Sequence, residues 1–111
     1  MATEIDAFIG RDNKRSWTIR LGGAVVPDNT ITRVVLNLGG NCLDTNEPAD
    51  PISLENNNTE VHVQLGLWAH ATPGVVQGHQ VVFDAQAPNG LAWPENEIFE
   101  VTFYDWGACT P

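Results

Sequence analysis

The sequence predicts an all-β domain, an antiparallel β-sandwich of six to eight short strands. Three observations predict this fold. Apolar and polar residues alternate with a period of two in several separate segments. Residues that favour turns stand between these segments. No segment carries an apolar stripe with helical spacing. A chain of 111 residues is the size of one domain, so we expect a single sandwich over residues 1–111.

Each expected strand follows from its own pattern. In Ser16–Leu21 the apolar residues Trp17, Ile19 and Leu21 share one face, as in a half-buried strand. Ile31–Leu38 is apolar on both faces, as expected of a central strand. The clearest alternation lies in Glu60–Leu67. The remaining expected strands are an edge strand at Ile5–Ile9, a short strand at Ile52–Leu54, and strands at Val81–Gln86 and Glu97–Asp105.

Turn residues separate these strands. Gly22-Gly23 follows the first long strand, and Gly39-Gly40-Asn41 ends the central one. Pro88-Asn89-Gly90 is a strong turn signal, because Pro presets φ while Asn and Gly tolerate a positive φ. The segment Gly39–Asn58 is expected to be a long acidic loop.

The charges are segregated along the chain. The net charge is −9, which argues against a nucleic-acid partner or an anionic membrane surface. All five Lys and Arg residues lie within residues 1–33, and ten of the 14 acids follow residue 33. A chain with a basic edge and an acidic body can associate with copies of itself. We therefore place an interaction surface at Arg11, Lys14 and Arg15, although a solvated acidic surface alone would also give this pattern.

No motif indicates catalysis or a bound metal. His62, His70 and His79 match no zinc-binding spacing, and the acidic segment 44–50 lacks the pattern of a calcium loop. The sequence also lacks nucleophile, phosphate-binding and dinucleotide-binding signatures. We expect no enzymatic activity, no metal and no cofactor. Cys42 and Cys109 are expected to be reduced thiols, and the sequence leaves open whether they approach each other.

Tryptophans are the second candidate contact surface. Trp17 stands on the apolar face of a strand and is expected in the core. Trp68, Trp93 and Trp106 stand at strand ends or in loops. There they can pack at the rim of the core, or they can be exposed and contact a partner or a sugar ring.

The sequence carries no targeting signal. Its N-terminus has neither a basic segment nor an apolar segment of a secretory signal, and no apolar run is long enough to span a membrane. We expect synthesis in a cytoplasm and no membrane partner.

The order of these features resembles a known module. A polar start, Asp12–Arg15, leads into an alternating strand, and the central strand follows a Pro-Asp-Asn turn. Near the end, His79–Asp84 leads through Asn89-Gly90 and Trp93-Pro94 to the closing strand. This order is similar to the immunoglobulin-like β-sandwich at the N-terminus of phage baseplate upper proteins. Unlike those proteins, this chain has a long acidic loop and no coiled coil or receptor-binding region after the sandwich.

The resemblance implies a structural protein of a phage virion, in the tail, baseplate, neck or capsid decoration. It implies docking on other virion proteins and self-association into a homo-oligomer or array, with localisation to the virion after synthesis in the host cytoplasm. It brings no catalytic residue to this chain. The alternative function is a carbohydrate-binding module that uses exposed tryptophans.

Overall fold

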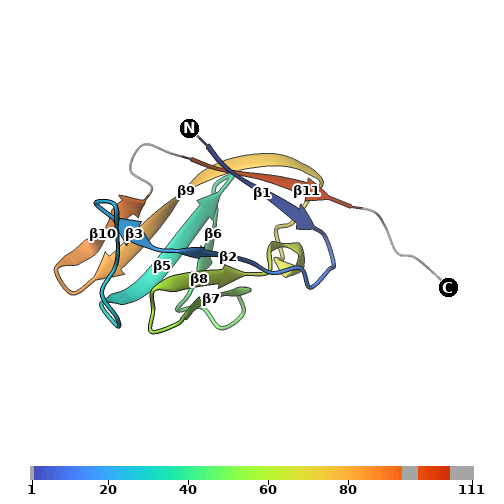
Figure 1. The fold of residues 1–111 in the computed structure, drawn as a ribbon. Helices are drawn as coiled ribbons and strands as arrows, with labels where there is room; N and C mark the ends of the chain where they lie inside the picture. The colour runs from blue at the N-terminus through green and yellow to red at the C-terminus, as the bar shows by residue number, and fades with distance from the viewer. Residues whose placement is uncertain (1, 94–97, 106–111) are drawn as a thin grey trace.

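The computed structural model describes residues 2–93 and 98–105, without the side chains of residues 2, 3 and 93. This part of the chain is nearly all β, as predicted (Figure 1). Its strands are β1 (Ala2–Phe8), β2 (Arg15–Thr18), β3 (Arg20–Leu21), β4 (Ala24–Val25), β5 (Ile31–Leu38), β6 (Asn41–Asp44), β7 (Ile52–Glu55), β8 (Glu60–Val63), β9 (Gly74–Asp84), β10 (Ala87–Trp93) and β11 (Ile98–Tyr104); a 3-10 turn, η1 (Leu65–Leu67), follows β8. Within the described residues, no helix is long and apolar enough to cross a membrane.

Two sheets form a sandwich-like fold. The larger sheet has the order β1-β11-β9-β5-β6, and β10 also pairs with β9. The smaller sheet has the order β2-β8-β7, and β3 and β4 form a separate hairpin. Strands β10 and β11 lie one after the other along the edge of β9 opposite β5, because β10 pairs with residues 80–84 and β11 with residues 74–78. The predicted sandwich is confirmed at this level, whereas its immunoglobulin-like character stays a prediction.

The structure differs in two details from the predicted antiparallel sandwich of six to eight strands. β1 pairs with β11 in parallel, in continuous register from Ala2 opposite Ile98 to Phe8 opposite Tyr104. The described residues also form eleven strands. The period of two indicates which face of a strand is buried, but it carries no information about the direction of the neighbouring strand.

The expected long loop Gly39–Asn58 contains two strands. Gly39 and Gly40 adopt φ values of 59° and 88°, which suit a two-residue hairpin turn. The chain therefore reverses directly and β6 pairs with β5, with Cys42 opposite Asn37. Residues 45–51 then connect β6 to β7.

Three predicted strand boundaries are wrong. The strand expected at Glu60–Leu67 ends at Val63, and the chain turns into η1. The strand expected at Ser16–Leu21 is interrupted after Thr18. The strand expected at Val81–Gln86 begins much earlier, at Gly74, and ends at Asp84.

The predicted turn at Pro88-Asn89-Gly90 lies within β10 instead. The chain reverses earlier, where the Asp84 carboxylate accepts the N–H groups of Gln86 and Ala87, each at 2.8 Å. The register of β10 on β9 then shifts between Ala87 and Leu91. Gly90 has a φ of 84° and lies against the Phe83 ring, where a side chain would have no room.

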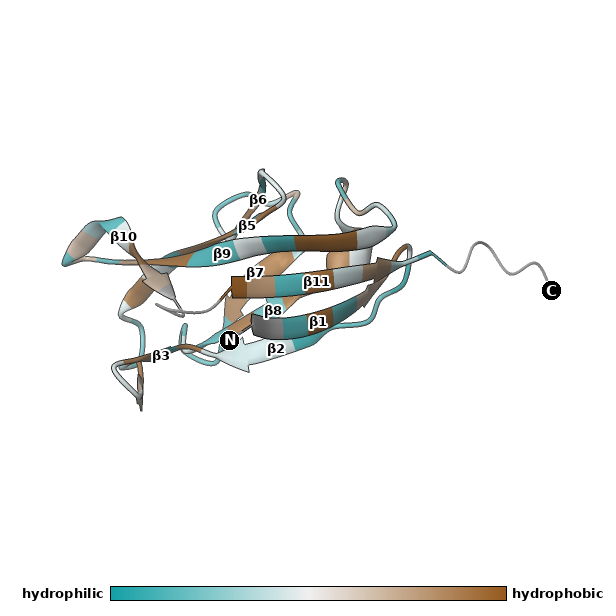
Figure 2. Ribbon diagram, turned by 90° about the horizontal axis from the view of Figure 1, so that it is seen from above, coloured by the Kyte–Doolittle hydropathy of each residue, from teal (hydrophilic) through white to brown (hydrophobic). Residues whose placement is uncertain are grey.

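The core lies between the two sheets. Hydrophobic and hydrophilic residues alternate along β11 and β1 (Figure 2). Phe99 is the largest fully buried side chain, and the Trp17 ring lies 5.1 Å from it, between ring centroids. The buried hydrophobic side chains are Ile5, Ala7, Ile19, Val26, Ile31, Val34, Leu36, Leu38, Leu43, Ile52, Val61, Val63, Leu65, Trp68, Val82, Phe99, Val101 and Phe103.

Candidate functional site

On one side of the sandwich, each sheet ends in a strand whose outer edge pairs with no other strand of the described residues, and we call such an edge free. β1 is the last strand of the larger sheet and β2 the last strand of the smaller sheet. Figures 1 and 2 place these two strands on the same side of the molecule. We call this side the β1–β2 seam and define it as β1, the linker of residues 9–14, and β2. Free strand edges are the usual places where a sheet accepts another strand.

The opposite side of the sandwich is bridged by the chain itself. There residues 45–51 connect β6 to β7. Thr45 and Val34 exchange two hydrogen bonds, both at 3.0 Å, and the Asp44 N–H donates to the Asp50 carboxylate at 2.9 Å. The Thr45–Val34 bonds extend the pairing of β5 with β6, and the Asp44 bond occupies a backbone group on the outer edge of β6, as a covering loop does.

In β1, the backbone groups of every second residue point away from the larger sheet. The Ile9 N–H donates to the Tyr104 carbonyl at 2.9 Å, so residues 5, 7 and 9 face β11. Both backbone groups of one residue point to the same side in a parallel pair, and that side alternates along the strand. The N–H and C=O groups of Glu4 and Asp6 therefore lie on the free edge.

The free edge of β2 follows from the same reasoning. The Ile19 N–H donates to the Thr59 carbonyl at 2.8 Å, so residues 15 and 17 also face β8 in this antiparallel pair. The N–H and C=O groups of Ser16 and Thr18 point the other way. The seam therefore presents two rows of backbone donors and acceptors, one from each sheet.

The linker holds the two edges in a fixed relation. The Gly10 N–H donates to the Gly66 carbonyl at 2.8 Å, and the Gln64 side-chain amide donates to the Asp12 carbonyl at 3.0 Å. Gly66 has no space for a side chain, because an added Cβ would overlap the Phe8 carbonyl oxygen. The glycine lets η1 pack directly on the backbone of the linker, so the sequence sets the relative position of β1 and β2.

Charges of opposite sign lie on the two edges of the seam. Glu4 and Asp6 are exposed on the outer face of β1. Arg11 and Lys14 are exposed and Arg15 is half-buried at the start of β2, where its guanidinium donates to the Lys14 carbonyl at 3.3 Å. In the part of the chain that the structure describes, Lys14 and Arg15 form no ion pair.

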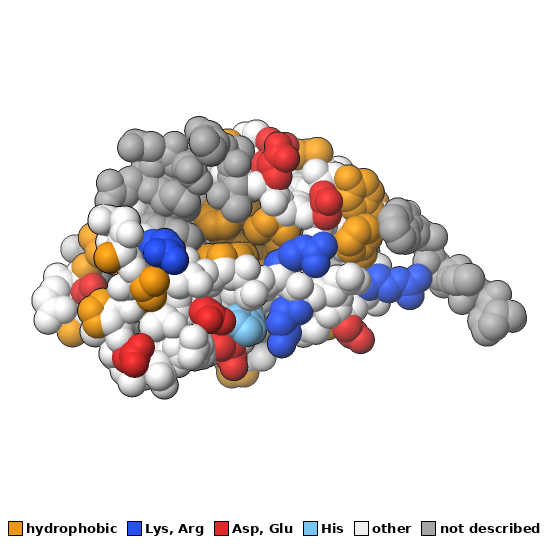
Figure 3. Space-filling view, viewed as in Figure 1, with side chains coloured by type: hydrophobic (Ala, Val, Ile, Leu, Met, Phe, Trp, Pro, Cys, Tyr) orange, Lys and Arg blue, Asp and Glu red, His pale blue; other side chains and the backbone are white. Residues whose placement is uncertain are grey.

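Figure 3 shows the side chains on this side of the molecule. Lys and Arg side chains lie on the lower layer, which also carries Asp and Glu side chains, and further Asp and Glu side chains lie on the upper layer. Hydrophobic side chains are visible between the layers. The three basic residues predicted from the sequence are thus gathered on this side by the linker and β2. The acidic partners on β1 were missed, although the alternation Glu4-Ile5-Asp6-Ala7 signals two acids on one strand face.

Of the tryptophans predicted as a second contact surface, the structure describes only the side chain of Trp68. Trp68 is only 6% exposed and packs beside Phe103, with its ring 5.2 Å from the His70 ring between centroids. The placement of Trp68 on an exposed contact surface is therefore wrong: its ring belongs to the core. The side chain of Trp93 and all of Trp106 lie outside the described residues.

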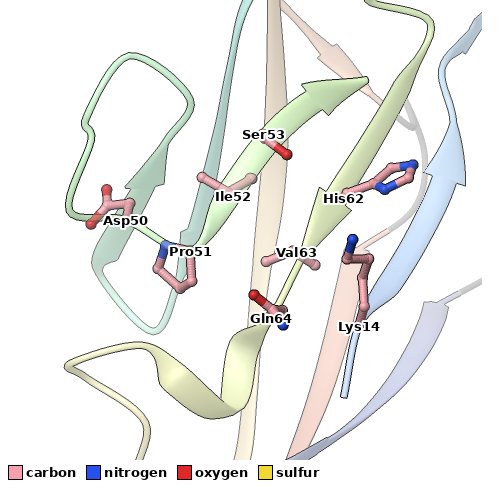
Figure 4. Close-up of a pocket in the computed structure, with 8 residues that line it drawn as sticks. All are labelled: Lys14, Asp50, Pro51, Ile52, Ser53, His62, Val63 and Gln64. Atoms are coloured by element: carbon pink, nitrogen blue, oxygen red, sulfur yellow. The ribbon is translucent and has the colours of Figure 1, made fainter. Parts of the chain in front are cut away.

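A shallow hollow of about 240 Å³ lies on the outer face of the smaller sheet, next to the seam (Figure 4). Lys14 and His62 approach each other at one side of it, and Asp50 lies at the opposite side. The His62 Nε2 atom is 3.0 Å from the Glu60 carboxylate, and this contact lowers the pKa of Glu60. Ser53 is opposite His62 across the strands, and no hydrogen bond joins these two side chains.

The side chains considered as metal ligands do not come together in the part of the chain that the structure describes. Among the described residues, no group of three His, Cys, Asp or Glu side chains could hold a metal ion. Cys42 is an exposed free thiol on β6, and Cys109 lies outside the described residues.

An ion pair between Arg33 and Asp44 lies where the acidic segment begins, and its contribution to the stability of the fold depends on pH. Arg33 donates to both carboxylate oxygens of Asp44 and also lies 5.1 Å from the centre of the Phe83 ring. The hydrogen bonds from Arg33 lower the pKa of Asp44 below its ordinary value of 3.8. A carboxyl group whose pKa falls on folding stabilises the fold above its unfolded pKa, and this contribution disappears as the pH drops through the folded pKa.

We expect Asp44→Asn to lower stability at pH 7 by a modest amount, because the ion pair is partly exposed. Between pH 5 and pH 2 the stability of the wild type should fall more than that of the variant, so the two curves converge. Urea unfolding at a series of pH values measures this. A constant difference across the series would contradict the assignment.

Comparison with known proteins gives no relative. No protein-family model matches the chain, and no curated protein and no solved structure matches it either.

Proposed function

We propose that this domain is a non-enzymatic structural module of a phage virion that acts by docking and self-association through the β1–β2 seam. The observation that carries the proposal is the pair of free strand edges on one side of the sandwich, with acids on one edge and bases on the other. The phage setting is supported by the sequence resemblance alone.

The seam is suited to association for a physical reason. Backbone groups on a free edge gain hydrogen bonds when another strand is added, and side chains beside the edge select the partner. Lys14 and Arg15 have no carboxylate partner within the described chain, so an acidic surface can approach them without first breaking an ion pair. A small sandwich also gains hydrophobic burial by covering an open side.

The carbohydrate-binding alternative is weaker than the sequence alone suggests. It requires an exposed tryptophan as a platform, and Trp68 is buried. Trp17 is half-buried and points into the core against Phe99. Neither described tryptophan offers such a platform, while the side chain of Trp93 and all of Trp106 lie outside the described residues.

The first test is the solution mass of the purified protein, measured by size-exclusion chromatography with light scattering at low and high salt. We expect an oligomer whose mass falls as salt is added, because salt screens the charges at the seam. A monomer at every salt and protein concentration would contradict self-association.

The triple variant Arg11→Glu/Lys14→Glu/Arg15→Glu places acids on both edges of the seam. We expect its oligomer to dissociate at protein concentrations at least about tenfold higher than for the wild type. Circular dichroism and the unfolding midpoint control for the fold, since these three side chains are at the surface or half-buried. An unchanged oligomer in a folded variant would place self-association on another surface.

A further inference from the structure

We infer that the partner at the seam is a second copy of this chain, and that β1 of each copy pairs with β2 of the other around a two-fold axis parallel to the strands. This inference rests on the proposed self-association and specifies its geometry. Such a dimer joins the larger sheet of one copy to the smaller sheet of the other, and it does so twice.

The directions of the strands permit this pairing. β1 and β2 run in opposite directions, because the short linker of residues 9–14 turns the chain from one sheet to the other (Figure 1). A two-fold axis parallel to the strands preserves these directions. β1 of one copy then meets β2 of its partner as an antiparallel pair, which is the commoner and slightly more stable arrangement.

The spacing of the sheets also permits it. Packed sheets lie about 10 Å apart, and neighbouring strands about 4.8 Å apart. The axis exchanges the upper and lower layers of the second copy. Both free edges of one copy are therefore matched at once, and the contact is self-complementary, as closed symmetric dimers require.

The free backbone groups match in kind. β1 offers the N–H and C=O groups of Glu4 and Asp6, and β2 offers those of Ser16 and Thr18. In an antiparallel pair, alternate residues exchange two hydrogen bonds with a residue opposite. Each half of the dimer can therefore gain about four such bonds, and the two-fold axis doubles this number.

Charge decides between the two symmetric arrangements. An axis perpendicular to the sheets would instead pair β1 with β1 and β2 with β2. That arrangement places the acidic edge of β1 beside its own copy, and the edge of β2 that carries Lys14 and Arg15 beside its own copy. Like charges opposite each other destabilise a strand pair, whereas opposite charges stabilise it. The parallel axis places the acids of β1 beside the bases that flank β2, so it is the favoured arrangement.

Four variants test this assignment. Glu4→Lys/Asp6→Lys makes both edges basic, and Lys14→Glu/Arg15→Glu makes both edges acidic. We expect each to raise the dissociation constant of the dimer at least about tenfold. The combined fourfold variant again sets acids against bases and carries the wild-type net charge, so its dimer should return to within about threefold of the wild-type dissociation constant.

The matched control combines Lys14→Glu/Arg15→Glu with Glu47→Lys/Glu55→Lys. It has the same net charge as the fourfold variant, but its new lysines replace exposed acids far from the seam, on the side of β7. We expect no recovery. Recovery in this control would mean that only net charge matters, and failure of the fourfold variant to dimerise would overturn the β1–β2 pairing. Arg15 is half-buried, so Lys14→Glu alone serves as a second variant if the double variant does not fold.

Amide hydrogen exchange tests the strand pairing itself. At concentrations where the protein is monomeric, the amides of Ile5 and Ala7 should be protected by β11, while those of Asp6 and Ser16 should exchange quickly. In the dimer, we expect the exchange of Asp6 and Ser16 to slow at least about tenfold.

The two failures are distinguishable. If the wild type is monomeric under all conditions, the proposed self-association fails. If the wild type associates but the amides of Asp6 and Ser16 still exchange quickly, self-association stands and the strand pairing is wrong.

Discussion

Replacing Gly78 with alanine is expected to destabilise the domain severely. Gly78 is buried in β9, between β5 and β11, opposite Leu38 on one side and Phe99 on the other. An added Cβ would overlap the carbonyl oxygen of Asn37 and would lie 2.7 Å from its carbonyl carbon and 2.9 Å from the Leu38 Cα. All three atoms belong to the backbone of β5, so no side chain can rotate away. The strands themselves would have to separate.

The expected cost is at least about 3 kcal/mol, at or beyond the upper end for overpacked cores, because backbone atoms must move. A domain of this size has a total free energy of unfolding of about 5–15 kcal/mol, so many molecules of the variant would unfold on mild heating. Chemical denaturation followed by tryptophan fluorescence measures the difference in the free energy of unfolding.

Gly23→Ala is the matched control. Gly23 has a φ of 81° and no atom within 4 Å of an added Cβ. Alanine there would therefore cause no steric overlap, and its only cost would be the strain of a left-handed backbone conformation. We expect a cost of about 1–2 kcal/mol. If Gly78→Ala were as mild as this control, the close packing of β5 on β9 would be wrong.

Gly78 also shows why part of the fold could not be predicted. Strands β8 and β11 were expected from the alternation of apolar residues, and β5 was expected as a central strand that is apolar on both faces. All three are present, and each buries one face. The first part of β9 was missed, because Val75-Val76 is followed by Gln77-Gly78-His79-Gln80 and the segment shows no apolar period of two. Its inner positions hold a glycine and a glutamine, and only the neighbouring strands explain why both are buried.

The candidate site was predicted in part for similar reasons. The run Arg11–Arg15 is local in sequence, so its charges could be placed on one edge before the fold was known. Its acidic counterpart on β1 depends on a parallel pair with the last strand, a contact between the two ends of the chain. Trp68 was misplaced because the alternation Glu60–Leu67 predicted a continuous strand. The chain instead turns into η1, exposes Leu67 and directs Trp68 inward.

The second large effect is expected at Trp17, behind the free edge of β2. The Trp17 indole N–H donates to the Gln80 side-chain oxygen at 2.9 Å, and its ring packs on Phe99. Trp17 belongs to the smaller sheet and Gln80 and Phe99 to the larger sheet, so this side chain joins the two layers. We expect Trp17→Ala to cost about 3 kcal/mol, at the lower end for a buried tryptophan because the ring is half-buried.

Packing and hydrogen bonding at Trp17 can be separated. Trp17→Phe keeps an aromatic ring but removes the donor, which leaves the fully buried Gln80 amide without any partner in the described residues. The side-chain nitrogen of Gln80 already has no hydrogen-bond partner among the described residues. A buried polar group left unpaired costs about 1–3 kcal/mol, whereas replacing both partners by apolar groups of similar shape is nearly neutral. We therefore expect Trp17→Phe to be destabilising. Gln80→Met leaves the Trp17 N–H unpaired but also removes the unpaired Gln80 nitrogen, so we expect its cost to be smaller.

The double variant Trp17→Phe/Gln80→Met decides the matter, because its stability should exceed that of Trp17→Phe alone. A coupling free energy of about 1 kcal/mol or more in this double-mutant cycle would show that the hydrogen bond, beyond the ring packing, holds β2 against the larger sheet. Additive effects would assign the role of Trp17 to packing alone. In either case Trp17 holds β2 in place from the inside, while the outer edge of the same strand stays free for a partner.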